Sequence, residues 1–284
     1  MVLRPALRLP VPLSRRALNL LRHLSHCPRD VQIEPRTFGE VEGEAHTPGS
    51  ADGAIGIVYF HGGGYRVGST ATQRGLVAHI ARSTGAATAS VEYRLAPEHP
   101  CPAAIDDGLA AYEAVASEPG RRVVLSGDSA GAGVALAVAI AARDRGLPQP
   151  AGLALISPWV DLAMTGASYA RNAKAEAVLT VSLLRDAARD YCGGRDLDDP
   201  LCSPLYADLA GLPPMTIHTG SHDLLQSDCE ALAERVRISG GEAELRVFED
   251  LWHDFHLHAG HLADADLAVA ELGAWIAARL RAPV

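Results

Sequence analysis

The chain lacks the features that mark membrane proteins, nucleic-acid-binding proteins and disulfide-stabilised proteins. No apolar run reaches the about 20 residues that a membrane-spanning helix needs. The formal net charge is -9 and there is no basic stripe, whereas nucleic-acid binding draws on a basic surface. The five cysteines are odd in number, widely spaced and never arranged as CxxC; this pattern favours neither a disulfide framework nor a zinc ribbon. We therefore expect a cytoplasmic protein with no nucleic-acid partner and no stable membrane insertion.

The first 27 residues are rich in Arg and contain no Asp or Glu. This composition mildly resembles a targeting peptide, but a secretory signal would also need a long apolar run followed by a cleavage site of small residues. We expect instead an amphipathic helix that packs on the domain, because Leu18, Leu20, Leu21 and Leu24 fall near one helical face.

The body of the chain alternates between short β-rich runs and amphipathic stretches rich in Ala and Leu. Six runs predict strands: AIGIVYF, AATASVEY, RVVLSG, GLALIS, MTIHTG and AELRVF. Strands that alternate with helices, and that are apolar enough to be covered on both faces, indicate an α/β fold with a mostly parallel sheet. At 284 residues, we expect one domain spanning 1–284.

One long interval interrupts the alternation. From about 162 to 212 no good strand is present, and this length exceeds that of an ordinary loop. The interval therefore predicts a helical insertion. Together with about residues 1–30, it is expected to form a cap over the sheet's carboxyl edge, where open parallel sheets bind their ligands.

The segment GDSAG follows the predicted strand RVVLSG and opens a helix. It matches G-x-S-x-G, in which a sharp strand-to-helix turn exposes a serine hydroxyl and the glycines avoid clashes. Ser129 is the candidate nucleophile, and the neighbouring helix N-terminus favours developing negative charge. The alternative interpretation is an ordinary turn of small residues.

The segment HGGGYRVGS also follows a predicted strand. Three consecutive glycines indicate a place where the backbone approaches something closely. The N–H groups of Gly63 and Gly64, with that of Ala130 after the serine, are expected to form an oxyanion hole. A phosphate-binding loop is the competing function, but GxGxxG and GxxxxGK[ST] are absent from this segment. His61 and Asp128, inside the two motifs, are taken as supporting residues.

The segments HGGGYRVGS, VEYRLAPEHPCPAAIDD and GDSAG, in this order and spacing, resemble the hormone-sensitive-lipase-like branch of the α/β-hydrolases, the fold-3 carboxylesterases. The resemblance runs from about Ile57 to the last helix. It implies an eight-stranded, mostly parallel sheet with helices on both faces, a helical cap and no cofactor. Tyr93, Arg94 and Glu98 match the family's YRLAPE segment, and we treat them as structural.

A serine nucleophile needs a base, and the base needs an orienting carboxylate. In α/β-hydrolases these follow the serine in the order acid, then histidine. Asp223 comes directly after the strand MTIHTG, and it also matches the family's acid position. His253 is the first histidine after the strand AELRVF, within WHDF, which resembles the family's His-x-Phe/Trp position. Asp228 is expected to be a supporting carboxylate at the start of the following helix, where it could serve as an N-cap.

Three further histidines, His256, His258 and His261, follow the proposed base closely. The i,i+3 pairs in this cluster could approach a metal ion on a helix. Because three other loops already converge on serine chemistry, we expect instead that these three histidines lie on a solvated face and that the site contains no metal.

These residues predict a serine carboxylic-ester hydrolase, and the resemblance implies short acyl chains. It also leaves open a lactone hydrolase, since LWHDF resembles members that open cyclic esters, and a non-catalytic receptor for small molecules. Tyr65 and Trp252 are candidates for lining the pocket, with plain core packing as the alternative. The expected partner is a small-molecule ester, and the chain is expected to be a monomer or a homodimer.

Overall fold

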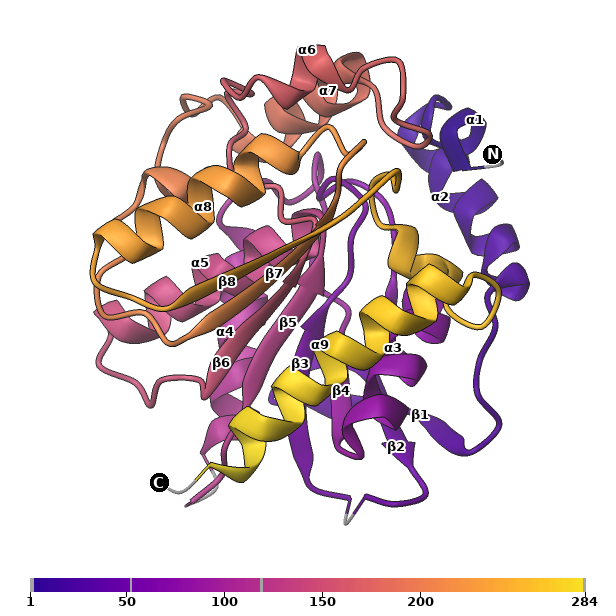
Figure 1. Cartoon of the computed structure of the whole chain (residues 1–284), viewed down its shortest axis with the longest axis vertical. Helices are drawn as coiled ribbons and strands as arrows, with labels where there is room; N and C mark the ends of the chain where they lie inside the picture. The colour runs from indigo at the N-terminus through magenta and orange to yellow at the C-terminus, as the bar shows by residue number, and fades with distance from the viewer. Residues whose placement is uncertain (1–2, 52, 118–119, 283–284) are drawn as a thin grey trace.

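The computed structural model describes residues 3–51, 53–117 and 120–282 (Figure 1). In this part of the chain, eight strands form one sheet in the order β1-β2-β4-β3-β5-β6-β7-β8. Strand β2 pairs antiparallel with β1 and β4, and all other neighbours are parallel. The strands are β1 (Val31–Phe38), β2 (Val41–Pro48), β3 (Ile55–Phe60), β4 (Ala87–Val91), β5 (Val124–Asp128), β6 (Gly152–Ile156), β7 (Met215–Gly220) and β8 (Ala243–Phe248). The predicted α/β fold with a mostly parallel eight-stranded sheet is confirmed.

The sequence pattern located β3 to β8, whereas β1 and β2 were expected only through the family resemblance. Strand β1 lies at the edge of the sheet, and most of its side chains are exposed. It carries Glu34, Pro35 and Arg36 at consecutive positions, which suits an edge strand but weakens the apolar signal of a buried one. By contrast, every residue of β3, β4, β5 and β6 is buried.

Helices cover both faces of the sheet, which explains the burial of the central strands. Helices α3 (Thr70–Thr84) and α9 (Ala263–Arg281) lie on the face nearer the viewer in Figure 1. Helices α4 (Ala103–Ala116), α5 (Ala130–Asp144) and α8 (Gln226–Ile238) share a core on the opposite face, and α4 and α5 are seen behind the strands in Figure 1. Successive residues of β3 therefore enter two separate cores: Ile57 and Tyr59 pack with α3 and α9, whereas Val58 and Phe60 pack with α4 and α5.

The remaining helices gather at the end of the sheet where the parallel strands finish (Figure 1). From the N-terminal segment come α1 (Leu3–Leu7), α2 (Val11–Leu21) and the 3-10 helix η1 (Arg22–Leu24). Between β6 and β7 lie α6 (Ser168–Arg171), α7 (Val181–Cys192) and the 3-10 helix η2 (Pro204–Tyr206), with no strand among these residues, all of which are described.

Polar contacts attach the N-terminal segment to the rest of the molecule. The Arg4 guanidinium donates to the carbonyls of Glu176, Val178 and Leu179 in the insertion. Arg15 of α2 pairs with Glu98 at 2.7 Å. The expectation that Leu20 packs on the domain is wrong, because its side chain is 75% exposed, whereas Leu18 is half-buried. The side chains of Leu21 and Leu24 lie outside the described part of the structure.

Across the described ranges, no helix has both the length and the apolar character required to cross a membrane.

Candidate active site

Ser129 occupies the sharp turn between β5 and α5. Its backbone has φ 54° and ψ -121°, a conformation that costs free energy for a residue with a side chain and is typical of functional sites. The flanking glycines are required by space: a Cβ on Gly127 would lie 2.6 Å from the backbone of Gly131, and one on Gly131 would collide with the Phe60 carbonyl. The turn thus presents the Ser129 hydroxyl beyond the end of β5, as the sequence motif predicts.

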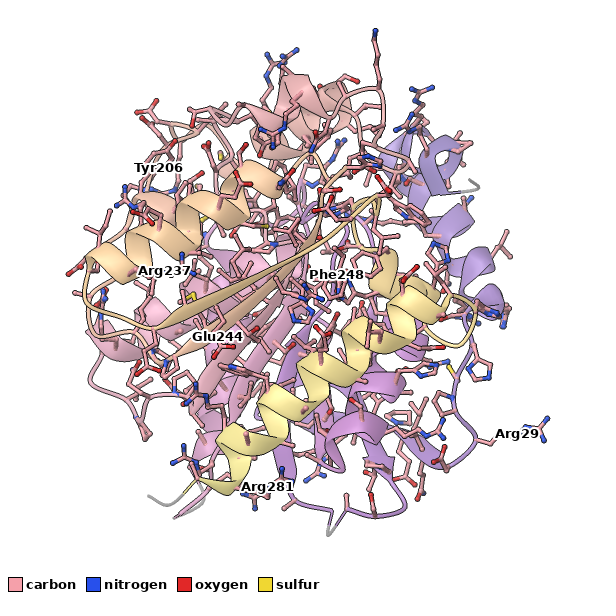
Figure 2. The ribbon with its side chains drawn as sticks, viewed as in Figure 1. Arg29, Tyr206, Arg237, Glu244, Phe248 and Arg281 are labelled. Atoms are coloured by element: carbon pink, nitrogen blue, oxygen red, sulfur yellow. The ribbon has the colours of Figure 1, made fainter. Side chains whose placement is uncertain are left out.

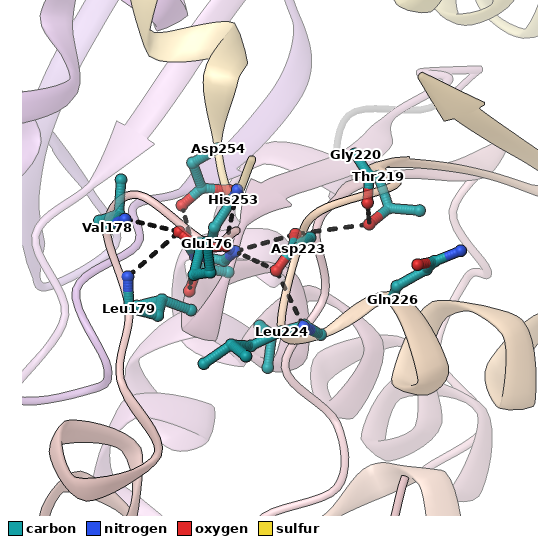
Figure 3. A network of polar contacts seen from close by, with 12 residues as sticks. Glu176, Val178, Leu179, Thr219, Gly220, Asp223, Leu224, Gln226, His253 and Asp254 are labelled. Carbon is teal, nitrogen blue, oxygen red and sulfur yellow. Dashed lines mark hydrogen bonds and ion pairs between the residues drawn. The ribbon is translucent and has the colours of Figure 1, made fainter. Parts of the chain in front are cut away.

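His253 connects this hydroxyl to the carboxylate of Asp223, and Figure 3 shows His253 beside Asp223. The His253 Nε2 atom lies 2.9 Å from Ser129 Oγ. Its Nδ1 atom lies 3.1 Å from each carboxylate oxygen of Asp223. The three side chains come from the loops after β5, β7 and β8, so the structure brings together the three residues that the sequence named as nucleophile, base and acid.

Hydrogen bonds fix the Asp223 carboxylate. Its Oδ1 accepts from the Leu225 N–H at 2.8 Å at the start of α8. The insertion also holds this loop, because the Asn172 side-chain amide donates to the Asp223 carbonyl at 2.7 Å and to the Ser221 carbonyl at 3.0 Å. Asn172 therefore couples the insertion to the acid, a role for which the sequence carries no motif.

The electrostatic environment favours a protonated His253. Burial opposes the charged imidazolium, but the carboxylates of Asp223 and Asp254 more than offset this cost and raise the pKa of His253 well above its usual value. The His253 imidazole is therefore able to hold a proton, which a general base must do after it removes one from a hydroxyl.

The glycine loop after β3 lies next to Ser129. Gly63 has φ 125° and Gly64 has φ 60°, conformations that favour glycine. Among the described residues, the N–H groups of Gly63 and Gly64 donate to no other group, and Ala130 begins α5, where the first N–H groups of a helix lack partners. The three N–H groups named from the sequence are thus available to bind a negative oxygen.

Asp128 holds this loop in place. It is fully buried and accepts from the Gly62 N–H at 2.9 Å, the Tyr59 hydroxyl at 2.7 Å and the Gln73 side-chain amide at 2.9 Å. Burial first, and the Asp254 charge second, raise the pKa of Asp128 to about 7.

His61 is also buried near the loop. Its ring stacks on Tyr93 with centroids 4.3 Å apart, and its Nδ1 lies 2.8 Å from the Gly62 carbonyl. The side chains of His61 and Asp128 both contact the glycine loop and not Ser129. These contacts fit the expected supporting role of the two residues.

The prediction that Asp228 caps α8 is wrong. Leu225 precedes the helix, and Asp228 lies inside its first turn. The Asp228 carboxylate instead accepts from the N–H groups of Val160 and Asp161 at 3.3 and 3.0 Å and from the Tyr169 hydroxyl at 2.9 Å. It is turned towards the loop that follows β6, so it braces the start of the insertion.

Two further acids at the site carried no recognised signal in the sequence. Glu176, in the insertion, is only 2% exposed, and its Oε2 accepts from the His253 N–H at 3.1 Å. Asp254 places its Oδ2 2.9 Å from His253 Nε2 (Figure 3). Asp254 occupies the variable position of the His-x-Phe segment, and a charged residue there was the one available clue.

The two pocket candidates differ in burial. Tyr65 is buried, stacks on Tyr191 with centroids 3.8 Å apart and donates to the Trp159 carbonyl at 3.1 Å. These contacts fit the core-packing alternative. Trp252 is half-buried and packs edge-on against His258 at 5.7 Å beside the proposed base.

The expectation of a solvated face for the later histidines is wrong for His256. Its ring is fully buried and packs against Phe255 and against Phe248, which lies near the middle of the view in Figure 2. Burial lowers the pKa of His256 well below its usual value. His258 is half-buried and His261 is exposed. Within the described ranges, no group of three or more His, Cys, Asp or Glu side chains is arranged to hold a metal ion.

Comparison with known proteins agrees with this geometry. Residues 57–257 match a family model described as alpha/beta hydrolase fold. An acetyl-hydrolase from Streptomyces hygroscopicus is 38% identical over 242 residues, which cover 84% of this chain and 81% of that protein.

Two solved structures are similar over almost the whole chain. An esterase from the bacterial hormone-sensitive lipase family superposes with a TM-score of 0.94 at 34% identity, covering 98% of this chain and 96% of that one. The crystal structure of EstE5, soaked with p-nitrophenyl butyrate, superposes with a TM-score of 0.90 at 34% identity, covering 97% and 93%. The chain therefore belongs to the hormone-sensitive-lipase-like branch of the α/β-hydrolase family of carboxylesterases.

Proposed function

We propose that the chain is a serine carboxylic-ester hydrolase for short-chain acyl esters, with Ser129 as nucleophile, His253 as general base and Asp223 as the orienting acid. The observation that carries the proposal is the pair of contacts on one imidazole: Ser129 Oγ at 2.9 Å from Nε2 and Asp223 at 3.1 Å from Nδ1. The membership in a carboxylesterase family supports the same chemistry.

The reaction uses two acyl transfers. Ser129 Oγ attacks the ester carbonyl while His253 Nε2 takes its proton, and Asp223 stabilises the resulting imidazolium. The N–H groups of Gly63, Gly64 and Ala130 bind the oxyanion of the tetrahedral intermediate. His253 then gives its proton to the departing alcohol, which leaves an acyl group on Ser129. Water, activated by His253, attacks this acyl-enzyme and releases the carboxylic acid.

The complete set of nucleophile, base, acid and oxyanion donors supports an enzyme over a non-catalytic receptor. The acetyl-hydrolase relative and the similar structure soaked with a butyrate ester support short acyl chains. A panel of p-nitrophenyl esters from acetate to palmitate, together with several lactones, would separate short-chain esters from cyclic ones.

The cap is proposed to comprise about residues 1–30 and 162–212. Helix α7 supports this, because it reaches the glycine loop: a Cβ added to Gly64 would lie 3.4 Å from Ala187 Cβ of α7. The Arg4 contacts to the insertion join its two parts. We expect a monomer or a homodimer, which sedimentation equilibrium would distinguish.

Replacement of two residues tests the function. Ser129→Ala and His253→Ala should hydrolyse p-nitrophenyl acetate at no more than about a thousandth of the wild-type rate, because each removes a member of the reacting set. Near wild-type turnover by either purified, folded variant would contradict the assignment. His222→Ala is the matched control, since this half-exposed histidine precedes Asp223 and, among the described residues, its side chain pairs only with Asp250.

A further inference from the structure

Asp254 turns back onto the residue that precedes it. Its backbone adopts a left-handed conformation with φ 51° and ψ 34° at the start of the 3-10 helix η3 (Phe255–His258). Its Oδ2 lies 2.9 Å from His253 Nε2, the nitrogen that also lies 2.9 Å from Ser129 Oγ. The buried Oδ1 has no hydrogen-bond partner among the described residues. The His253 Nε2 atom thus contacts two oxygens, the Ser129 hydroxyl oxygen and a carboxylate oxygen of Asp254.

A proton count follows from these contacts. Because Asp223 accepts at Nδ1, that nitrogen of His253 carries a hydrogen. A bare imidazole nitrogen and a carboxylate oxygen are both acceptors and repel each other, so their ion-pair distance of 2.9 Å favours the state in which one of them carries a second proton. This geometry therefore favours one proton more than the base needs, whether that proton is on nitrogen or on oxygen.

The surroundings favour retention of that proton. Figure 3 shows Asp254 on the opposite side of His253 from Asp223, close to Glu176 of the insertion. Burial raises the pKa of Asp254 against the lowering effect of His253, and the charges of Asp223 and Glu176 raise it further. The titratable groups whose charges act on Asp254, or on which its charge acts, are Tyr59 at the end of β3, Asp128 at the end of β5, Glu176 in the insertion, Asp223 after β7 and His253 beside it. Within the described part of the chain, these groups have the largest charge interactions with Asp254 and only His253 among them is cationic, so ionisation of Asp254 adds to a cluster of negative charge.

We propose that Asp254 is a second carboxylate of the proposed base, one that holds a proton at His253 Nε2 and thereby sets the pH above which His253 can accept the Ser129 proton. The proposal rests on the assignment of Ser129 and His253 as nucleophile and base. While the extra proton is present, Nε2 cannot take another. Its release leaves a free nitrogen lone pair facing the serine hydroxyl.

Because the Asp254 carboxylate stabilises the protonated pair, it shifts the acid limb of activity to higher pH. Its removal leaves His253 with Asp223 alone, so the acid limb should move to lower pH. A carboxylate this close to an imidazole typically changes the pKa by about 1–3 units. A purely structural role would change kcat or stability without moving this limb.

Asp254→Asn is the main test, because asparagine removes the charge and tolerates a left-handed backbone. Asp254→Gly is the second variant, since glycine keeps the backbone even if the amide packs poorly. Asp250→Asn is the matched control: it removes the same charge four residues earlier in the same loop, from a side chain that is 91% exposed. The dependence of kcat/KM on pH, with p-nitrophenyl acetate, is measured for all four proteins.

We expect the acid limb of both Asp254 variants to lie about one unit or more below that of the wild type, and that of Asp250→Asn to coincide with it. The rate at which a fluorophosphonate labels Ser129 should show the same shift without an ester substrate. Superimposable limbs in wild type and both Asp254 variants would overturn the proposal while leaving the esterase intact.

Failure of the proposed function looks different. In that case the wild type neither hydrolyses esters nor reacts with the fluorophosphonate at any pH. An NMR titration of the 15N-labelled His253 imidazole then still compares proton affinity between wild type and Asp254→Asn, and equal affinities would overturn the role of Asp254 independently of turnover.

Discussion

Replacement of Glu176 tests whether the insertion positions the proposed base. The Glu176 carboxylate is buried and accepts three backbone N–H groups: that of His253 at 3.1 Å on one oxygen, and those of Val178 and Leu179 at 2.6 and 3.2 Å on the other. Glutamine has a single acceptor oxygen. If that oxygen keeps Val178 and Leu179, the His253 N–H faces an NH₂ group and loses its partner.

The size of the effect can be worked from this single contact. A hydrogen bond to a charged acceptor contributes about 1.5–3 kcal/mol. If the lost hydrogen bond lowers the free energy of unfolding by this amount, Tm should decrease on the order of 5 °C for a chain of this size. If its loss instead displaces His253 and raises the activation free energy by this amount, kcat should decrease by about 10- to 100-fold, since 1.4 kcal/mol corresponds to about a factor of ten.

We measure kcat for p-nitrophenyl acetate and Tm by calorimetry, each at the pH optimum of the variant. A change in the proton affinity of His253 is then not mistaken for a change in its position. Glu249→Gln is the control, because this exposed glutamate lies in the loop that leads to His253 and forms no hydrogen bond or ion pair with it. Wild-type kcat and Tm in Glu176→Gln would refute the claim that the insertion positions the base.

Two further outcomes are expected. Gly63→Ala should lower kcat by about 10²–10³-fold, because a Cβ there collides with the Val67 carbonyl and displaces an oxyanion donor; Gly240→Ala, also at positive φ but with open space around it, should keep wild-type kcat. Burial raises the pKa of Asp128 to about 7 in the folded state, whereas its pKa in the unfolded chain is 3.8. The free energy of unfolding should therefore fall between about pH 4 and pH 7 by more in the wild type than in Asp128→Asn, as measured by urea unfolding.

Local chemistry made part of this site predictable. The turn at Ser129 and the glycines at 62–64 need particular residue types at fixed spacing, so the sequence reveals them. Asp223 and His253 were found because parallel strands end at one edge of the sheet, which brings the loops after them together. Strands β3 to β7 were predictable for a similar reason, since burial on both faces leaves continuous apolar runs.

The unpredicted features depend on contacts between distant segments. Asn172 and Glu176 act across about 50 and 77 positions of the chain, and neither belongs to a motif. The burial of His256 depends on Phe248 and on the neighbouring His218, which no periodicity within residues 251–261 indicates. Asp228 looked like a cap because helix N-termini favour Asp, but tertiary contacts to the loop after β6 determine where its carboxylate points.

In the proposed mechanism, the β5–α5 turn and His253 make one serine, Ser129, nucleophilic. The most direct measurement is peptide mapping by mass spectrometry after the native protein reacts with a fluorophosphonate. We expect a single adduct on Ser129, and none when His253→Ala is treated for the same time. An unmodified Ser129 in the wild type, or an adduct on another residue alone, would contradict it.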